Sequence, residues 1–78
     1  MKTIADLKIG ERAFIKAFRQ VELSLKLLEM GCLPGEIIEV IRIAPFGDPI
    51  AYSIAGYVLS MRRSEAATVL INLSVDNK

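Results

Sequence analysis

The sequence predicts a small, mainly β fold: a barrel of about five strands with one α-helix inserted after the first strand. Short segments that alternate apolar and polar side chains, or are rich in Ile and Val, recur along the chain between Gly and Pro residues. Only one stretch has the composition of a longer helix. We expect one domain, residues 1–78. Closing its sheet into a barrel would remove the exposed edges of an open sheet.

The first segments combine a capped turn with a strand. Residues 3–7 are expected to form a short turn, because Thr3 can cap it and Asp6 follows three residues later. Residues 13–19 alternate with a period of two, which indicates a strand. We expect one set of its side chains to face inward, Ala13, Ile15 and Ala17, and the other to face outward, Phe14, Lys16 and Phe18.

Residues 21–30 form the predicted helix, which ends at Gly31, a residue suited to a left-handed stop. Its apolar residues lie on two faces, although a surface helix of a small domain needs only one. We expect the first face to pack on the barrel, with Leu23, Leu27 and Met30, and the second to point away from it, with Val21, Leu25 and Leu28.

The rest of the chain contributes the remaining strands. Gly47 and Gly31 are placed where a positive φ is expected. Either Ser64 or the arginines before it are expected to open the last helical turn. The predicted elements are a strand at 36–44, a turn at 44–49, strands at 50–54 and 57–61 joined by a hairpin at Ala55-Gly56, a helical turn at 62–67 and a closing strand at 68–73.

Composition favours a protein-binding role. Hydrophobic residues make up 53% of the chain and its mean hydropathy is +0.42, which is high for a chain with so little interior. Part of this apolar surface is expected to remain outside and to meet a partner. The net charge is +1 and the basic residues form no stripe, so we expect no nucleic-acid binding.

The reactive residues argue against a metal site and against catalysis. The chain has no His and one cysteine, Cys32, whereas iron and zinc sites favour His and Cys clusters and acid–base catalysis favours His. Asp48, between Gly47 and Pro49, is interpreted as a turn residue that accepts backbone N–H bonds. A single cysteine and a charged N-terminus indicate neither an oxidising compartment nor a secretion signal, so we expect a cytoplasmic protein.

Three consecutive pieces of sequence resemble the FeoA domain. They are KLLEMGCLPG at residues 26–35, APFGDPI at 44–50 and LSMRRSEA at 59–66. The family patterns they match are R-L-x-x-[LM]-G-x-x-P-G, A-P-x-G-D-P and L-x-x-R-x-x-E-A. The opening LKIGE at residues 7–11 is similar as well. This chain departs from the pattern at Lys26, where the family usually has Arg, and at Cys32, where it more often has an aliphatic or small residue.

The resemblance implies an SH3-like barrel in a stand-alone accessory protein of ferrous iron uptake. The implied partner is the membrane ferrous iron permease with its cytoplasmic G domain, which would hold the protein at the inner membrane. The alternative is a metal-responsive regulatory module, because the same fold occurs as the C-terminal domain of metal-dependent repressors. Arg62 or Arg63 could act as an arginine finger toward the permease, but we interpret both as residues of the barrel surface.

The surplus apolar side chains give the expected partner-binding residues. They are Phe14 and Phe18 of the first strand and Val21, Leu25 and Leu28 of the helix. Two alternatives remain open at this stage. The helix could fold over the phenylalanine face so that each covers the other, or the same surface could join copies of the chain in a homo-oligomer.

Overall fold

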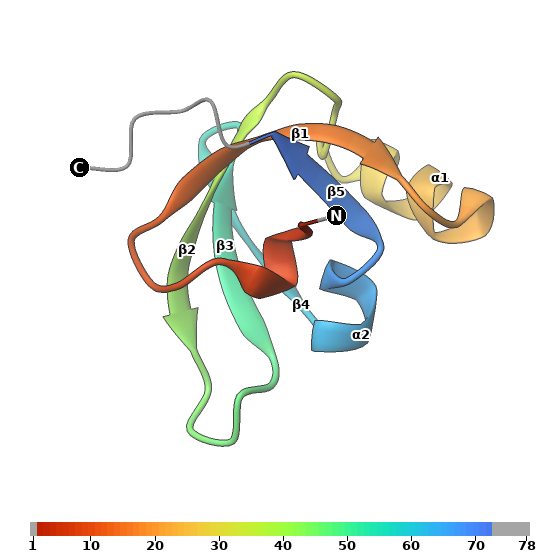
Figure 1. Ribbon diagram of the computed structural model, residues 1–78. Helices are drawn as coiled ribbons and strands as arrows, with labels where there is room; N and C mark the ends of the chain where they lie inside the picture. Colours follow the sequence, from red (N-terminus) through yellow and green to blue (C-terminus); the bar gives the residue numbers. More distant parts are fainter. Residues whose placement is uncertain (1, 73–78) are drawn as a thin grey trace.

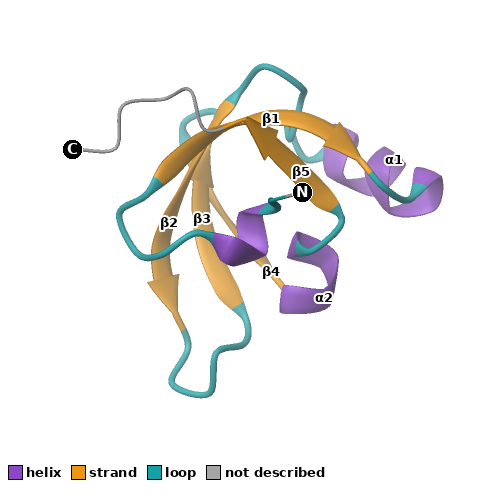
Figure 2. Cartoon of the chain, viewed as in Figure 1, coloured by secondary structure: helices purple, strands orange, loops and turns teal. Residues whose placement is uncertain are grey.

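The computed structural model describes residues 2–72 of the 78-residue chain, apart from the side chains of Val21, Leu23 and Ser24. One curled sheet carries three short helices (Figures 1 and 2). The mainly β fold, with a helix after the first strand, is confirmed. In chain order the elements are η1 (Ile4–Asp6, a 3₁₀ helix), β1 (Arg12–Phe18), α1 (Val21–Glu29), β2 (Ile37–Ile43), β3 (Ile50–Ile54), β4 (Tyr57–Met61), α2 (Arg63–Ala66) and β5 (Val69–Asn72).

The five strands lie in the order β4-β3-β2-β1-β5, and all neighbouring strands are antiparallel. The N-terminal segment adds to the outer edge of β5. Thr3 pairs with Leu70 there, and the Ile71 N–H donates to the carbonyl of Lys2 at 3.1 Å. η1 and α2 pack side by side (Figure 1). Residue 73, which we expected to close the last strand, lies outside the described residues.

A β-bulge in β1 corrects one expectation about its faces. The pairing of β1 with β5 shifts register between Ile15 and Ala17, so β1 carries one extra residue at this point. An extra residue moves the following side chains to the opposite face. The alternation therefore holds only as far as Ile15, and Phe18 packs against the core. The expectation that Phe18 faces outward was wrong.

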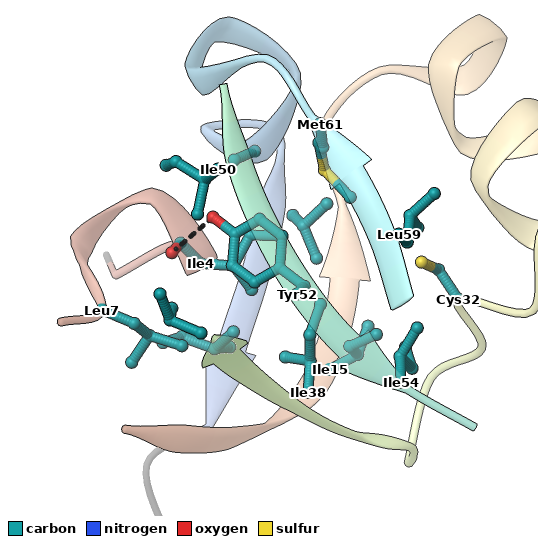
Figure 3. Packing of buried hydrophobic residues seen from close by; sticks show 14 of the residues in the cluster. Ile4, Leu7, Ile15, Cys32, Ile38, Ile50, Tyr52, Ile54, Leu59 and Met61 are labelled. Carbon is teal, nitrogen blue, oxygen red and sulfur yellow. Dashed lines mark hydrogen bonds between the residues drawn. The ribbon is translucent and has the colours of Figure 1, made fainter. Parts of the chain in front are cut away.

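The core lies inside the curled sheet and is closed by η1 and by the segment after α1. The side chain of Tyr52 is fully buried at its centre and donates to the carbonyl of Ile4 at 3.0 Å (Figure 3). This bond satisfies a hydroxyl that would be costly to bury alone. Burial also raises the pKa of Tyr52. Other side chains of this core include Ile15, Ile38, Ile50, Ile54, Leu59 and Met61.

The local signals for turns and caps are confirmed in most cases. Thr3 caps η1, and the Asp6 carboxylate accepts the Thr3 N–H at 2.9 Å. Gly31 and Gly47 both have positive φ, +91° and +88°. The sequence left open whether Ser64 or one of the preceding arginines begins the last helical turn. In the structure Arg62 is the N-cap residue of α2.

Candidate interaction surface

The C-terminal half of α1 separates a buried face from an exposed one, as the sequence predicted. Leu27 is 3% exposed and belongs to the core, whereas Leu25 is 60% exposed. Met30, just after the helix, packs against the core, and Leu28 is half-buried. The helix therefore does not fold back far enough to cover all of the surplus apolar surface.

The end of α1 is fixed by hydrogen bonds and close packing. The hydroxyl of Tyr57, from β4, donates to the carbonyl of Met30 at 2.6 Å. The Cys32 N–H donates to the carbonyl of Leu27 at 2.9 Å, and the Cys32 side chain is buried in the core. Gly31 lies between these two contacts with a left-handed φ. This end of the helix is therefore held against the barrel while the side chain of Leu25 points away.

An ion pair connects α1 to α2. The Lys26 ammonium lies 3.5 Å from the Glu65 carboxylate, and the other oxygen of Glu65 accepts the Arg62 N–H at 2.9 Å. Lys26 is the position at which the FeoA pattern usually has Arg. The pair is solvent-exposed and contributes little to stability. The ion pair instead helps to position Leu25, because Lys26 is the neighbour of Leu25 on the same helical turn.

We define the helix-end surface as the partly or fully exposed apolar side chains around the C-terminal half of α1: Leu25, Leu28, Leu33 and Tyr57. The sequence predicted the first two. Leu33 and Tyr57 were missed, because only the fold places them there. The Leu33 N–H bonds to the Gly31 carbonyl, and Tyr57 reaches Met30 from another element.

The other predicted partner-binding residues are not gathered on this surface. Phe14 is half-buried on β1, directly opposite Ile37 of β2. This cross-strand pair covers part of the outer face of the sheet. Phe18 packs against the core, and the side chain of Val21 lies outside the described part of the structure. Within the described residues, Leu25 and Leu28 remain from the predicted set.

The turn between β2 and β3 is joined to α2 and η1 by one residue, Arg63. Its N–H donates to the Asp48 carboxylate at 2.8 Å, its Nε donates to the Gly47 carbonyl at 3.0 Å, and its guanidinium also donates to the Ala5 carbonyl at 3.0 Å. Asp48 thus accepts a backbone N–H, as predicted. These contacts support the interpretation of Arg63 as a residue of the barrel surface. At the tip of this turn, Phe46 is 100% exposed.

The described residues provide contact surfaces and no reactive cluster. Within residues 2–72, no three His, Cys, Asp or Glu side chains are grouped closely enough to hold a metal ion. Burial raises the pKa of the Cys32 thiol, which keeps it protonated and a poor nucleophile. The arrangement can bind a partner through its apolar surface.

The curled five-stranded sheet, with helices at its ends and an apolar surface beside α1, defines a small SH3-like barrel. A solved structure with this fold is that of Stenotrophomonas maltophilia FeoA complexed with zinc, described as a prokaryotic SH3 domain protein. It is 21% identical, with a TM-score of 0.82 over 92% of this chain and 91% of that chain. A manganese-dependent transcriptional repressor has the same TM-score at 11% identity, over 90% of this chain and 35% of its own. Both comparisons show the fold alone.

The family follows from the sequence comparison. The model of the FeoA domain matches residues 2–73, and the chain therefore belongs to the FeoA family. FeoA from Chlorobium tepidum is 29% identical, with a TM-score of 0.88 over 99% of this chain and 74% of that chain.

A curated relative from Porphyromonas gingivalis is much longer than this chain. It is a fusion of Fe(2+) transport protein A with the Fe(2+) transporter FeoB, and it is 34% identical over 80 residues. The match includes 95% of this chain, which spans only 9% of that relative. In the part of this chain that the structure describes, no helix is long and apolar enough to cross a membrane.

Proposed function

We propose that the chain is a non-catalytic accessory protein of ferrous iron uptake that docks through its helix-end surface on the cytoplasmic G-protein region of the membrane ferrous iron permease. It would support or regulate transport from the cytoplasm, at the inner membrane, where its partner holds it. The observation that carries this proposal is the 60% exposure of Leu25 on a helix whose end is fixed to the barrel.

Family membership supports the pathway, and the fusion relative supports the partner. In the Porphyromonas gingivalis protein an FeoA part and a FeoB part belong to one chain. Covalent linkage raises the effective concentration of one part at the other, which makes a weak contact efficient. An FeoA domain that is not joined covalently to its partner would rely on its own surface for the same contact.

The size of the helix-end surface predicts a weak and reversible complex. Four apolar side chains around one helix end provide less area than a standard interface, which buries about 800 Å² on each partner. Within such a small contact, one central apolar side chain can carry about 2 kcal/mol of the binding free energy. Leu25 is the most exposed of the four, so we assign it this role.

The test compares three substitutions of a leucine or valine by aspartate. Leu25→Asp should leave the circular dichroism spectrum unchanged, because its side chain is exposed, and should weaken capture by the permease's cytoplasmic region about thirtyfold. Leu27→Asp should unfold the protein, because it places a carboxylate in the core. Val58→Asp, on β4 and 65% exposed, is the matched surface control and should bind normally.

Three results would contradict the proposal. Normal capture and normal iron uptake by the folded Leu25→Asp variant would exclude the helix end as the docking surface. Equal losses of binding in Leu25→Asp and Val58→Asp would show that added negative charge, and not the helix-end surface, determines capture. Unfolding of Leu25→Asp would mean that this side chain belongs to the core.

The second candidate is a metal-responsive regulatory module. It is favoured by the shared fold with the manganese-dependent repressor. Anaerobic calorimetry with Fe²⁺, Mn²⁺ and Zn²⁺ separates the two functions. A dissociation constant below about 1 μM, equivalent to about −8 kcal/mol, would favour the regulatory module, whereas weaker binding favours the accessory protein.

A further inference from the structure

The two edges of the sheet are treated differently by the fold. The edge at β5 is covered by the N-terminal segment, through the bridge between Thr3 and Leu70 and the hydrogen bond from Ile71 to Lys2. The edge at β4 is open, because no strand, bridge or backbone hydrogen bond within residues 2–72 joins β4 to a segment other than β3. An open edge strand is a template on which another strand can pair.

The ladder between β3 and β4 determines which backbone groups of β4 face this open edge. The two strands are joined by the two-residue turn Ala55-Gly56, so Ile54 and Tyr57, which flank the turn, form a hydrogen-bonded pair. Bonded and non-bonded pairs alternate along an antiparallel ladder. Val58 and Ser60 therefore direct their N–H and carbonyl groups away from β3, toward the open edge.

The residues of β4 do nothing to prevent pairing at this edge. Natural proteins protect an edge strand with charged side chains, proline or a bulge. Residues 57–61 contain no charged residue and no proline, and the register of β4 against β3 runs without a shift. Leu59 and Met61 point into the core (Figure 3), whereas Val58 is 65% exposed and Ser60 is also exposed. β4 is thus a regular, uncharged edge strand with an exposed outer face.

We propose that β4 pairs antiparallel with β4 of a second copy of the chain, about a two-fold axis at Leu59. With the two Leu59 residues opposite each other, Val58 lies opposite Ser60 of the second copy, and each such pair exchanges both N–H···O bonds. The outward groups of the strand are therefore complementary to themselves. The strand carries no charge, so its approach to an identical strand causes no repulsion between like charges.

The covered edge at β5 limits the assembly to two copies. A second copy offers the same open edge, β4, and its β5 edge is already occupied. Pairing through β4 uses the open edge of both copies, so the assembly closes as a dimer and does not grow into a filament. The dimer goes beyond the docking proposed above and does not depend on it, because Leu25 lies on α1 and takes no part in the pairing.

The short strand predicts a weak dimer, since its contact is smaller than a standard interface. Sedimentation equilibrium should show a change from monomer to dimer between about 10 μM and about 1 mM. Hydrogen exchange followed by NMR locates the contact. At the higher concentration the amide protons of Val58 and Ser60 should exchange about fivefold more slowly than at the lower one. Those of Tyr57 and Leu59 already bond to β3 and should change little.

Two substitutions of Ser60 separate the backbone from the side chain. Ser60→Pro removes the N–H that faces the open edge and leaves the bonds to β3 in place. This variant should keep the circular dichroism spectrum of the natural chain and should stay monomeric at about 1 mM. Ser60→Ala is the matched control, because it keeps the N–H and should dimerise as the natural chain does.

Opposite charges at residue 58 test the two-fold arrangement without altering the backbone. The residues 58 of the two copies lie diagonally across the axis, within reach of long side chains. Val58→Lys and Val58→Glu should each be monomeric, because pairing would bring like charges together. An equal mixture of the two variants should dimerise again.

Three outcomes would overturn the dimer. The first is a natural chain that stays monomeric up to about 1 mM. The second is association that both Ser60→Pro and Val58→Lys leave unchanged, which would place the contact between copies elsewhere. The third is protection of the Val58 and Ser60 amides by the permease's cytoplasmic region and not by higher concentration. An extended segment of that protein would then replace the second copy as the occupant of the edge.

Discussion

The hydroxyl of Tyr57 occupies the space that a side chain at Gly31 would need. Tyr57 donates to the Met30 carbonyl at 2.6 Å, and an added Cβ on Gly31 would collide with the same hydroxyl. Gly31 also has a φ of +91°. Two independent constraints thus require glycine at the point where α1 meets β4.

The close approach of Tyr57 to Gly31 predicts that substitutions at these two residues have coupled effects on the free energy of unfolding. Gly31→Ala should lower the free energy of unfolding by more than 2 kcal/mol, since it adds a collision to the cost of positive φ. Gly47→Ala should cost about 1–2 kcal/mol, because its surroundings leave room for a Cβ. In a Tyr57→Phe background the cost of Gly31→Ala should be smaller. Urea melts of the four chains in this double-mutant cycle measure the difference, and strict additivity would exclude the collision.

We expect the side chain of Arg63 to contribute more to the free energy of unfolding than the side chain of Arg62. Arg63→Met removes the hydrogen bonds to the Gly47 and Ala5 carbonyls, which predicts a loss of about 1–2 kcal/mol. Arg63→Lys should recover only part of it, because an ammonium lacks the guanidinium's fork of donors. The control is Arg62→Met, which should stay within about 0.5 kcal/mol of the natural chain. Equal denaturant midpoints for the two methionine variants would contradict this role.

The turn of the hairpin between β3 and β4 contains a residue with a strained backbone conformation that a substitution can relieve. Ala55 has a φ of +50° and Gly56 a φ of +88°, so both residues of the connection are left-handed. Two-residue hairpins with this conformation favour Asn-Gly. Ala55→Asn should therefore raise the free energy of unfolding by about 0.5–1 kcal/mol. Thermal and urea melts check it, and a destabilised variant would show that Ala55 is not strained there.

Stability should fall at alkaline pH because two buried groups keep their protons. Burial raises the pKa values of Cys32 and Tyr52 in the folded state. Above the ordinary thiol pKa of about 8.5, and again above about 10 for tyrosine, the unfolded chain releases protons that the native state retains. The unfolded state is then favoured, so the free energy of unfolding decreases as pH rises.

The Cys32→Ala substitution separates the contribution of Cys32 to this pH dependence from the contribution of Tyr52. Cys32→Ala should lower stability overall by leaving a small cavity, but should flatten the decrease between about pH 8 and pH 9.5. The later decrease, attributed to Tyr52, should remain. Urea melts from about pH 8 to about pH 11 measure both slopes. An identical pH profile in Cys32→Ala would contradict the assignment to the thiol.

The sequence by itself determined the order and type of the elements, because their signals are local. Alternation, helix-forming residues and Gly-Pro punctuation depend on neighbours along the chain. The cap at Thr3, the left-handed stop at Gly31 and the hairpin at Ala55-Gly56 belong to this class. The opposite orientations of Leu25 and Leu27 followed from helical periodicity.

The tertiary structure decided what depends on contacts between distant segments. The bulge in β1 reflects its register against β5, and it moved Phe18 from the expected outer face to a partly buried position against the core. Tyr57 became part of the helix-end surface only because β4 meets the end of α1. Arg63 reaches Ala5 and Gly47 across the fold. Pairing register and long-range hydrogen bonds are set by how the whole chain packs, so no local pattern could reveal them.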